Sequence, residues 1–412
     1  MRQFCKILIL LLSLFFLNSN FLYCKSNSQT PTITVESTAF SKIIIRIPDF
    51  KGDLLLSSKL TPLLRKLLNY HLIVLALKNP PLPGFKTKEF YLKGTVTQYK
   101  KSIYLKAELW DILKNQQIKP FNFFGDYKHP EAPVYLLCNR IIKEISGYQG
   151  IATTKIAFVK RSMNGDTLYV MDFSKLHLKK IKTADLILFP KFSPSGRKIA
   201  YIIYKNGKYI LEITDLYIGH IQKFFINGLS SSPIWYPDEK ALILTLSEGK
   251  NVNIYKFDLL THNLYPLIQG KGICQAGSIS PDGRYLAFVY DKGLGPQIYL
   301  MNLETKKIFR VSFEGKYNTS PRFSPKGDYL LYLSQSSGTR LILYNIKHNK
   351  AKILDLPLSL EDPVFSYTGD YILARGKGKE GTGIYIIHLD SQLYYLYLPG
   401  KNFLFPDWSK LW

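Results

Sequence analysis

The chain has 412 residues, of which 46% are hydrophobic, 14% aromatic and 21% charged, and this balance excludes a mostly disordered protein. The length allows two or three domains, and many aromatic residues beside only four Met and four Trp favour strands over helix bundles. The formal net charge of +25 is typical of proteins that bind nucleic acid, anionic membranes or other acidic partners.

The first residues have the pattern of an export signal. Arg2 and Lys6 precede an apolar run over residues 7–17, and a polar stretch follows. The run is too short to cross a bilayer, and no second apolar block accompanies it. We therefore predict a signal peptide over residues 1–24. Export argues against nucleic acid as a partner, because that polyanion is scarce outside the cytoplasm.

The four cysteines predict no disulfide framework. Cys24 lies at the expected cleavage site and keeps a lipoprotein open as an alternative, although the bulky Tyr23 stands where a lipid-modified cysteine needs a small neighbour. After cleavage only Cys138 and Cys274 remain, and they fall in different predicted domains.

Residues 25–148 are predicted to form a small α/β domain. Its first residues are rich in Ser, Thr, Asn and Gln and are expected to be mobile. Pro62 is expected to interrupt the first helix, and residues 146–150 are predicted to be a linker. Strand patterns cover residues 41–47, 71–77, 90–99 and 103–112, and helix patterns cover residues 54–68 and 134–145.

From residue 190 to the C-terminus the chain contains a recurring unit. The core of the unit is Pro-x-aromatic-Ser-Pro, followed by a tight turn and an apolar strand, and single positions vary between copies. A period of 42 to 44 residues with strand-like content is typical of a four-stranded β-propeller blade. We therefore predict a mainly β fold, with a propeller over residues 151–412 after the small α/β domain. The copies begin at Pro190, Pro233, Gly277, Pro321, Pro363 and Pro406.

The residue types of the repeat fit a blade. A proline on an inner strand costs no ladder hydrogen bond if its nitrogen points out of the sheet, and the aromatic residue two positions later can fill the wedge between blades. The Pro-Asp and Gly positions that follow suit a tight turn. The aromatic residues expected in the core between blades are Phe192, Trp235, Phe323, Phe365 and Trp408.

The two ends of the repeat array predict how the propeller closes. Residues 155–159 have the pattern of a second strand with no first strand before them, and Pro406 begins a first strand with nothing after it. We expect these two segments to pair within one blade. Five complete units and this split unit would give six blades without an exposed sheet edge.

The order of these parts resembles the TolB family of the Tol–Pal cell-envelope system. The resemblance covers nearly the whole chain, from the export signal through the α/β domain to the repeats. It includes residues 145–150 (ISGYQG) at the domain junction and residues 405–409 (FPDWS) at the C-terminus. The chain departs from the repeat pattern at Gly277, Glu239 and Tyr367, which puts partner details rather than the fold in question.

The sequence contains no recognisable catalytic motif. A propeller-type serine peptidase needs a hydrolase domain and a G-x-S-x-G elbow, and neither is present. The seven histidines are scattered, and His262 and His348 are expected in outer turns. The glycine-rich run over residues 376–383 lacks the ending of a phosphate loop and is predicted to be a hairpin. We therefore predict no catalytic residue, no cofactor and no metal, and hence no enzyme.

Partner binding is expected where the loops that lead into the inner strands meet, at one mouth of the propeller. The residues just before each repeat start are expected there, and their mixed apolar, polar and acidic character suits a protein partner. They are Leu188, Phe189, Ser231, Ser232, Gln275, Ala276, Thr319, Ser320, Glu361, Asp362, Leu404 and Phe405.

The resemblance to the TolB family implies specific partners. The mouth would bind Pal, the peptidoglycan-associated lipoprotein, and the N-terminal segment would bind a TolA-like inner-membrane protein. The expected role is a monomeric periplasmic scaffold, peripheral to the membrane through its partners, that supports outer-membrane integrity, cell division and protein transport. Two alternatives stay open: a propeller lyase or hydrolase, and a module that binds an anionic envelope polymer through charge.

Overall fold

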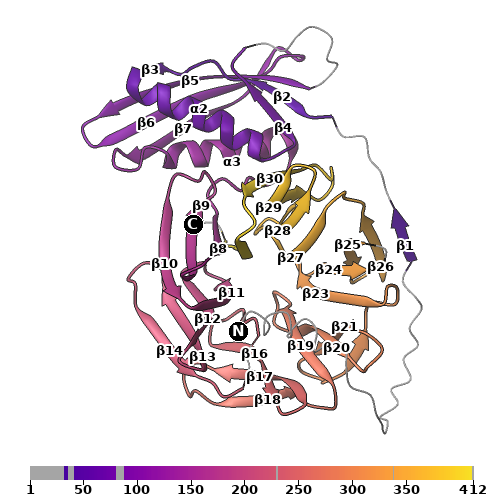
Figure 1. Cartoon of the computed structure of the whole chain (residues 1–412). Helices are drawn as coiled ribbons and strands as arrows, with labels where there is room; N and C mark the ends of the chain where they lie inside the picture. Colours follow the sequence, from indigo (N-terminus) through magenta and orange to yellow (C-terminus); the bar gives the residue numbers. More distant parts are fainter. Residues whose placement is uncertain (1–31, 36–40, 80–87, 229–230, 337, 411–412) are drawn as a thin grey trace.

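The structure is a computed structural model, and it describes residues 32–35, 41–79, 88–228, 231–336 and 338–410. It is mainly β, with an N-terminal α/β region and a β-propeller that Figure 1 shows below it. The predicted signal peptide over residues 1–24 lies outside the described residues, and so does most of the predicted mobile segment. Among the described residues, no helix is long and apolar enough to cross a membrane.

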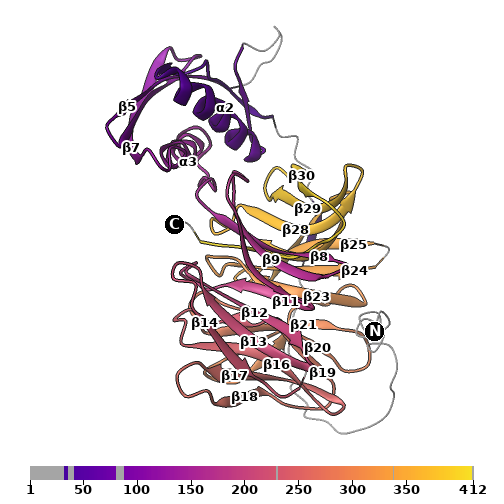
Figure 2. The ribbon, with the colours of Figure 1, turned by 60° about the vertical axis from the view of Figure 1, so that its left-hand side comes forward.

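A mixed sheet packs one face against two helices in the N-terminal region, as Figure 2 shows. Its strand order is β4-β2-β5-β6-β7, and β3 pairs with β5. Residues alternate along β5 and β6, so that side chains such as Leu92 and Leu105 pack in the core while their neighbours lie on the opposite face. The elements are β2 (Ile43–Arg46), β3 (Lys51–Gly52), α2 (Leu54–Tyr70), β4 (Val74–Leu77), β5 (Glu89–Tyr99), β6 (Ser102–Asp111), β7 (Gln116–Asp126) and α3 (Ala132–Ser146).

The predicted interruption of the first helix is wrong. Pro62 lies inside α2, because buried leucines such as Leu60 and Leu64 on both sides of it form one apolar stripe against the sheet. The helix begins after Asp53, whose carboxylate accepts a hydrogen bond from the Leu56 N–H at 3.0 Å.

The strand β7 has no counterpart in the sequence prediction. It carries several exposed polar residues and Pro120, so it lacks a regular apolar alternation. It lies at the edge of the sheet, where a proline is tolerated because one side of the strand has no neighbour.

The propeller consists of antiparallel sheets arranged around one axis (Figure 1). Three sheets hold four strands each: β31-β8-β9-β10, β11 to β14, and β27 to β30. A fourth, β23 to β26, is extended by β1 (Thr32–Val35), which pairs in parallel with β26. The strands β15 to β18 and β19 to β22 share one eight-stranded sheet, joined by a single parallel residue pair, Val252 with Ile273.

The strands of the propeller have the following bounds: β8 (Lys155–Ser162), β9 (Gly165–Asp172), β10 (Leu178–Ala184), β11 (Leu186–Phe192), β12 (Lys198–Lys205), β13 (Lys208–Asp215), β14 (Ile221–Phe225), β15 (Ile234–Trp235), β16 (Ala241–Glu248), β17 (Asn251–Asp258), β18 (Leu264–Ile268), β19 (Ile273–Ile279), β20 (Tyr285–Asp291), β21 (Gln297–Asn302), β22 (Ile308–Arg310), β23 (Tyr317–Phe323), β24 (Tyr329–Gln335), β25 (Thr339–Asn345), β26 (Lys350–Leu354), β27 (Ser359–Phe365), β28 (Tyr371–Gly378), β29 (Gly381–His388), β30 (Tyr394–Pro399) and β31 (Phe403–Trp408).

The last strand of the chain completes the sheet that begins with β8. β31 pairs antiparallel with β8, with Leu404 opposite Val159 and Trp408 opposite Ile156. This is the pairing between the two ends of the repeat array that the sequence predicts. The repeat aromatics also lie where expected: Phe192, Trp235, Phe365 and Trp408 are buried, and Phe323 is half-buried.

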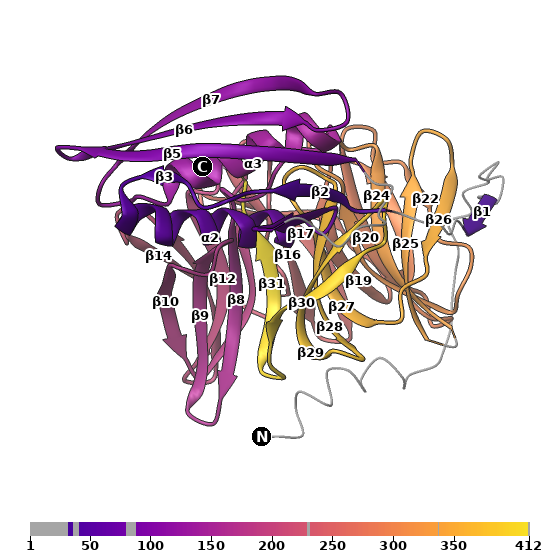
Figure 3. The same cartoon turned by 90° about the horizontal axis from the view of Figure 1, so that it is seen from above.

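The N-terminal region and the propeller share one hydrophobic core. Seen from above, the N-terminal region lies over the part of the propeller that contains β8 and β31 (Figure 3). His71, at the end of α2, is fully buried in this core, and its imidazole Nε2 accepts a hydrogen bond from the Ile151 N–H at 3.0 Å. The predicted linker over residues 146–150 therefore leads directly into a buried contact.

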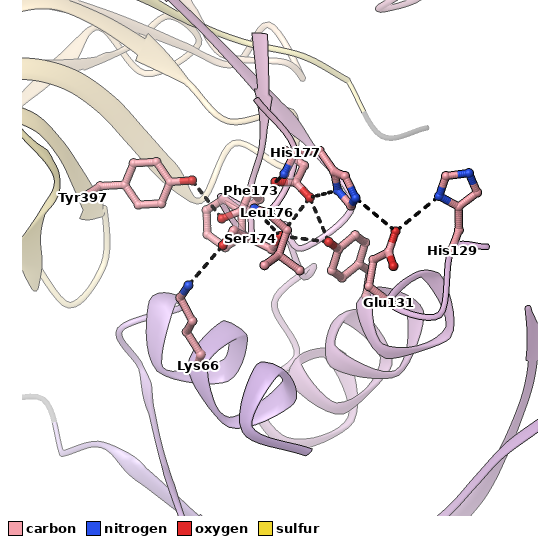
Figure 4. Close-up of polar contacts among 10 residues, drawn as sticks. Lys66, His129, Glu131, Phe173, Ser174, Leu176, His177 and Tyr397 are labelled. Atoms are coloured by element: carbon pink, nitrogen blue, oxygen red, sulfur yellow. Dashed lines mark hydrogen bonds and ion pairs between the residues drawn. The ribbon is translucent and has the colours of Figure 1, made fainter. Parts of the chain in front are cut away.

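A polar cluster beside this core joins α3 to the turn between β9 and β10 (Figure 4). Tyr135 of α3 donates a hydrogen bond to the Asp172 carboxylate at 2.8 Å, and Ser174 donates to the same oxygen at 2.8 Å. His177 lies 2.9 Å from this oxygen and 3.6 Å from the Glu131 carboxylate at the start of α3. One carboxylate thus orders the turn and holds it against the helix.

Replacing Asp172 with alanine is expected to lower the free energy of unfolding by about 2 kcal/mol, because the half-buried Tyr135 hydroxyl loses an ionic acceptor. Asp258 offers a matched control, since its carboxylate also accepts turn N–H groups but lies at the end of β17, away from the N-terminal region. Urea unfolding of both variants measures the difference. Equal losses would show that Asp172 acts only on its own turn.

Candidate partner-binding site at the propeller mouth

A backbone bulge recurs on the inner strands of the propeller. The pairing register shifts on β11, β19, β23, β27 and β31, where each repeat begins. On four of these strands the residue before the repeat proline has a positive φ: 49° at Phe189, 56° at Ser320, 49° at Asp362 and 52° at Phe405. Such residues and bulges carry a conformational cost and redirect side chains, which makes the start of the repeats a candidate site.

The predicted site residues mostly lie within strands, not in loops before them. The sequence prediction starts each inner strand at the repeat proline, but β11, β19, β23, β27 and β31 begin three or four residues earlier. Among the twelve residues, only Ser231 and Ser232 precede their strand, which is β15. The register shift explains the difference. The bulge interrupts the pairing at the start of the repeat, and the same strand pairs again with its neighbour in the residues that precede it.

These twelve residues, called the mouth residues below, differ in exposure. The rings of Phe189 and Phe405 lie 4.6 Å apart between centroids, which places two neighbouring inner strands side by side at this level. Gln275 and Glu361 are exposed, Ser232 and Ala276 are buried, and the half-buried residues are Leu188, Phe189, Ser231, Thr319, Ser320, Asp362, Leu404 and Phe405.

Charged residues at the repeat position after the proline were not singled out by the sequence analysis. Lys191 Nζ lies 2.8 Å from Asp407 Oδ1, and the Phe192 N–H donates to the other oxygen of Asp407 at 2.8 Å. Arg322 donates to the carbonyl oxygen of Gly277. These contacts link β11 to β31 and β23 to β19. The sequence does contain a signal for them, because the variable position of Pro-x-aromatic is charged in three repeats.

Asp362 extends this group of charges on β27. Burial raises the pKa of its carboxyl, although Lys191 and Arg322 oppose the shift. Burial also lowers the pKa of the Lys191 ammonium, against the attraction of Asp407. Next to Asp362, the Glu361 carboxylate pairs with Arg375. The inner strands therefore carry cations on β11 and β23 and anions on β27 and β31, which suits a polar protein surface that offers both signs of charge.

Two of the histidines and the glycine-rich run lie in turns and a hairpin. His262 lies between β17 and β18, and His348 lies between β25 and β26, as predicted. Residues 376–383 form the hairpin between β28 and β29, also as predicted. In the part of the chain that the structure describes, no three His, Cys, Asp or Glu side chains are grouped so that they could bind a metal ion.

Comparisons with known proteins agree with this architecture. A family model described as the TolB beta propeller domain matches residues 142–412. A Tol-Pal system protein TolB from Desulfotalea psychrophila is 26% identical over 203 residues, which cover 47% of this chain and 46% of that protein. Another, from Francisella tularensis subsp. mediasiatica, is 28% identical over 303 residues, or 68% of each protein. The chain thus spans about half the length of the first relative.

A solved structure extends the likeness to nearly the whole chain. The crystal structure of TolB from Acinetobacter baumannii superimposes with a TM-score of 0.81 and covers 90% of this chain and 97% of that one, at 22% sequence identity. At this level of identity the match shows a shared fold, with the α/β region and the propeller in one arrangement.

Proposed function

The chain belongs to the TolB β-propeller domain family, and from this premise we propose that it is a scaffold component of the Tol–Pal system. Two relatives carry that system in their names, and both are matched at low identity. The single observation that carries the proposal is the family match over residues 142–412, which includes all the inner strands that bear the mouth residues.

Within this proposal the mouth residues bind Pal, the peptidoglycan-associated lipoprotein. Support comes from the recurrent bulge and from the side chains gathered beside it: the Phe189 and Phe405 rings are apolar, while Lys191, Arg322 and Asp362 offer charges. An apolar patch with polar groups around it is the usual composition of a protein interface. The N-terminal segment would bind a TolA-like inner-membrane protein by strand addition.

The proposal includes six blades and two domains. We count the eight-stranded sheet as two blades, because β15 to β18 and β19 to β22 are each antiparallel and are joined by one residue pair only. We place the domains at residues 25–148 and 151–412, after a signal peptide over residues 1–24. The protein would be a monomer in the periplasm, peripheral to the membranes through its partners, and would support outer-membrane integrity, cell division and protein transport.

We propose a role in binding and not in catalysis. The twelve mouth residues include no histidine or cysteine, and the exposed carboxylate among them, Glu361, is held in an ion pair with Arg375. A hydrolase or lyase at this place would need a free general base next to an acid. Beside them, Lys191 pairs with Asp407 across neighbouring strands.

Arginine at the mouth is expected to weaken lipoprotein binding at least tenfold. Gln275→Arg and Thr319→Arg each add a long, charged side chain to the surface proposed to contact Pal, which changes both its shape and its charge. Both positions tolerate a larger side chain better than Ser232, which is buried. A pull-down from the protein's own envelope extract, followed by titration with purified lipoprotein, measures the loss.

Gln222→Arg is the matched control, because Gln222 is also exposed but lies on the outer strand β14. It should capture as much lipoprotein as the wild type. Undiminished recovery by both mouth variants would place the binding surface elsewhere. A wild-type interaction that disappears entirely between low and high salt would favour the anionic-polymer alternative.

A further inference from the structure

Within the described ranges, no helix covers one face of the N-terminal sheet. Both helices lie on one side of the sheet (Figures 2 and 3). This is the side that carries Leu92, Leu105 and Phe121, and the alternate residues of β5, β6 and β7 lie on the opposite side. This opposite side carries several aromatic residues among polar ones. An uncovered face of this composition is a candidate ligand surface.

Four side chains on this face surround a hollow of about 320 Å³ between β6 and β7. Tyr104 lies opposite Phe124, and Lys106 lies opposite Asn122, in the register of the two strands. The backbone of Leu105 and Phe123 separates the two pairs. We call these four side chains the cradle. Its volume is near the lower end of the range for small-molecule sites.

The two ends of the cradle differ in chemistry. At one end the Tyr104 and Phe124 rings meet edge to face with 4.9 Å between centroids, and the Phe124 side chain is 67% exposed. At the other end the Lys106 ammonium and the Asn122 amide are exposed. The cradle therefore combines an open aromatic surface with hydrogen-bond donors about 7 Å away along the strands.

A second aromatic group on the same face is already in contact with a lysine of the chain itself. Tyr91 lies opposite Trp110, but the Lys93 ammonium lies over the Trp110 ring at 5.2 Å and also pairs with Glu108 at 2.8 Å. In contrast, nothing among the described residues forms an ion pair with Lys106. The cradle is thus the part of this face where both an aromatic ring and a positive charge remain available.

We infer that the cradle binds a glycan whose sugar rings carry carboxylates. The C–H face of a pyranose ring can stack on Phe124 and Tyr104, while its carboxylate and hydroxyl groups accept hydrogen bonds from Lys106 and Asn122. Thr95 and Thr97 lie opposite Lys106 and Tyr104 on β5 and add hydroxyl groups beside the cradle. A lipid surface is a poorer fit, because polar side chains flank the aromatic pair on this face.

The charge of the ligand follows from the charges on this face. Arg46 pairs with Glu89, and Lys93 pairs with Glu108, so these four groups cancel in two pairs. Among the described residues Lys106 has no ion-pair partner, so it leaves a positive charge at the Asn122 end of the cradle, whereas the exposed Asp126 adds a negative charge on the same face beyond Phe124. An anionic ring compound complements both features, whereas a neutral sugar complements only the aromatic pair.

Titration of the purified protein with a hexamer of galacturonic acid tests this inference. We expect saturable binding, with the neutral glucose hexamer binding at least fivefold more weakly. Phe124→Ala and Lys106→Gln are each expected to weaken binding of the charged hexamer about fivefold, and Lys106→Gln should also reduce its salt dependence. Circular dichroism melts establish that both variants stay folded.

Two variants on the propeller serve as matched controls. Phe225→Ala removes a phenylalanine that is 74% exposed on β14, and Lys180→Gln removes an exposed lysine on β10. Both should bind the hexamer like the wild type. The inference is overturned if the wild type binds neither hexamer, if it binds both equally, or if the controls weaken binding as much as the cradle variants. Binding to vesicles with 30% anionic lipid that depends on Phe124, without hexamer binding, would assign the cradle to a membrane instead.

Discussion

Replacing Trp408 with alanine is expected to lower the free energy of unfolding by about 3–5 kcal/mol. The indole is 6% exposed, stacks on Phe173 with 6.2 Å between centroids and donates a hydrogen bond from Nε1 to Thr154 Oγ1 at 2.7 Å. Alanine removes this large side chain from the strand that completes the sheet and leaves the Thr154 hydroxyl without its donor. Urea unfolding followed by circular dichroism measures the change.

Two further variants separate the side chain from the strand. Trp408→Phe keeps an aromatic ring but lacks the indole N–H, so a smaller loss of about 1–2 kcal/mol is expected. A chain that ends at residue 402 lacks β31 and exposes the edge of β8, which should appear as self-association in size-exclusion chromatography. A monomeric truncated chain with wild-type stability would contradict the closing role of β31.

The repeat made much of the propeller predictable, because its information is local. Each turn after Pro-x-aromatic-Ser-Pro uses short-range hydrogen bonds, such as that from the Gly327 N–H to the Ser324 carbonyl at 2.9 Å. The same local pattern, complete in the middle of the chain and divided between its ends, also predicted that Trp408 would lie opposite the segment at Ile156. The pairing of the two ends of the propeller was thus inferred from a repeat unit that is divided between them.

The missed features are those that depend on neighbours in space. β7 has a proline and a polar sequence, and only its place at the sheet edge makes it a strand. The positions of the mouth residues depend on a bulge that the repeat proline does not predict. Phe189 and Asp362 adopt a left-handed conformation there, although neither is a glycine. The pairing of Lys191 with Asp407 joins residues at opposite ends of the propeller sequence.

The cradle was missed for a related reason. Tyr104 and Phe124 belong to different strands, and one of these strands was not predicted, so their contact could not be read from spacing. Lys106 alone is one of many basic residues in a chain with a net charge of +25. It becomes notable only once the structure shows which neighbouring lysines are neutralised by carboxylates, as Lys93 is by Glu108.

The shared core makes the N-terminal region and the propeller depend on each other through a neutral histidine. The His71 ring donates a hydrogen bond from Nδ1 to the Leu67 carbonyl at 2.8 Å and accepts one at Nε2 from the Ile151 N–H at 3.0 Å. A second proton on the ring would place its Nε2–H against the Ile151 N–H. Burial of the ring, which disfavours the charged form, lowers the pKa of His71 to about 4, and the neighbouring His388 adds to this shift.

Stability is expected to fall as the pH drops from about 6.5 towards 4. An unfolded imidazole has a pKa near 6.5, so in this range the unfolded state binds a proton that the folded state excludes. The loss from His71 should reach roughly 3 kcal/mol at the acidic end and should be absent above pH 7. His388, whose pKa is also lowered to about 4 by burial, contributes a loss of the same sign.

A His71→Leu variant isolates the contribution of this ring. Near pH 7 it should be less stable than the wild type by about 2–3 kcal/mol, because the Ile151 N–H and the Leu67 carbonyl lose their partner. Near pH 5 the gap should shrink by about 1–2 kcal/mol. Leucine does not titrate, whereas protonation of His71 in the unfolded wild type stabilises the unfolded state. Urea unfolding at both pH values measures the gap, and His348→Gln, at an exposed histidine, serves as a control. A gap for His71→Leu that stays constant or widens towards low pH would mean that the folded chain accommodates a protonated His71.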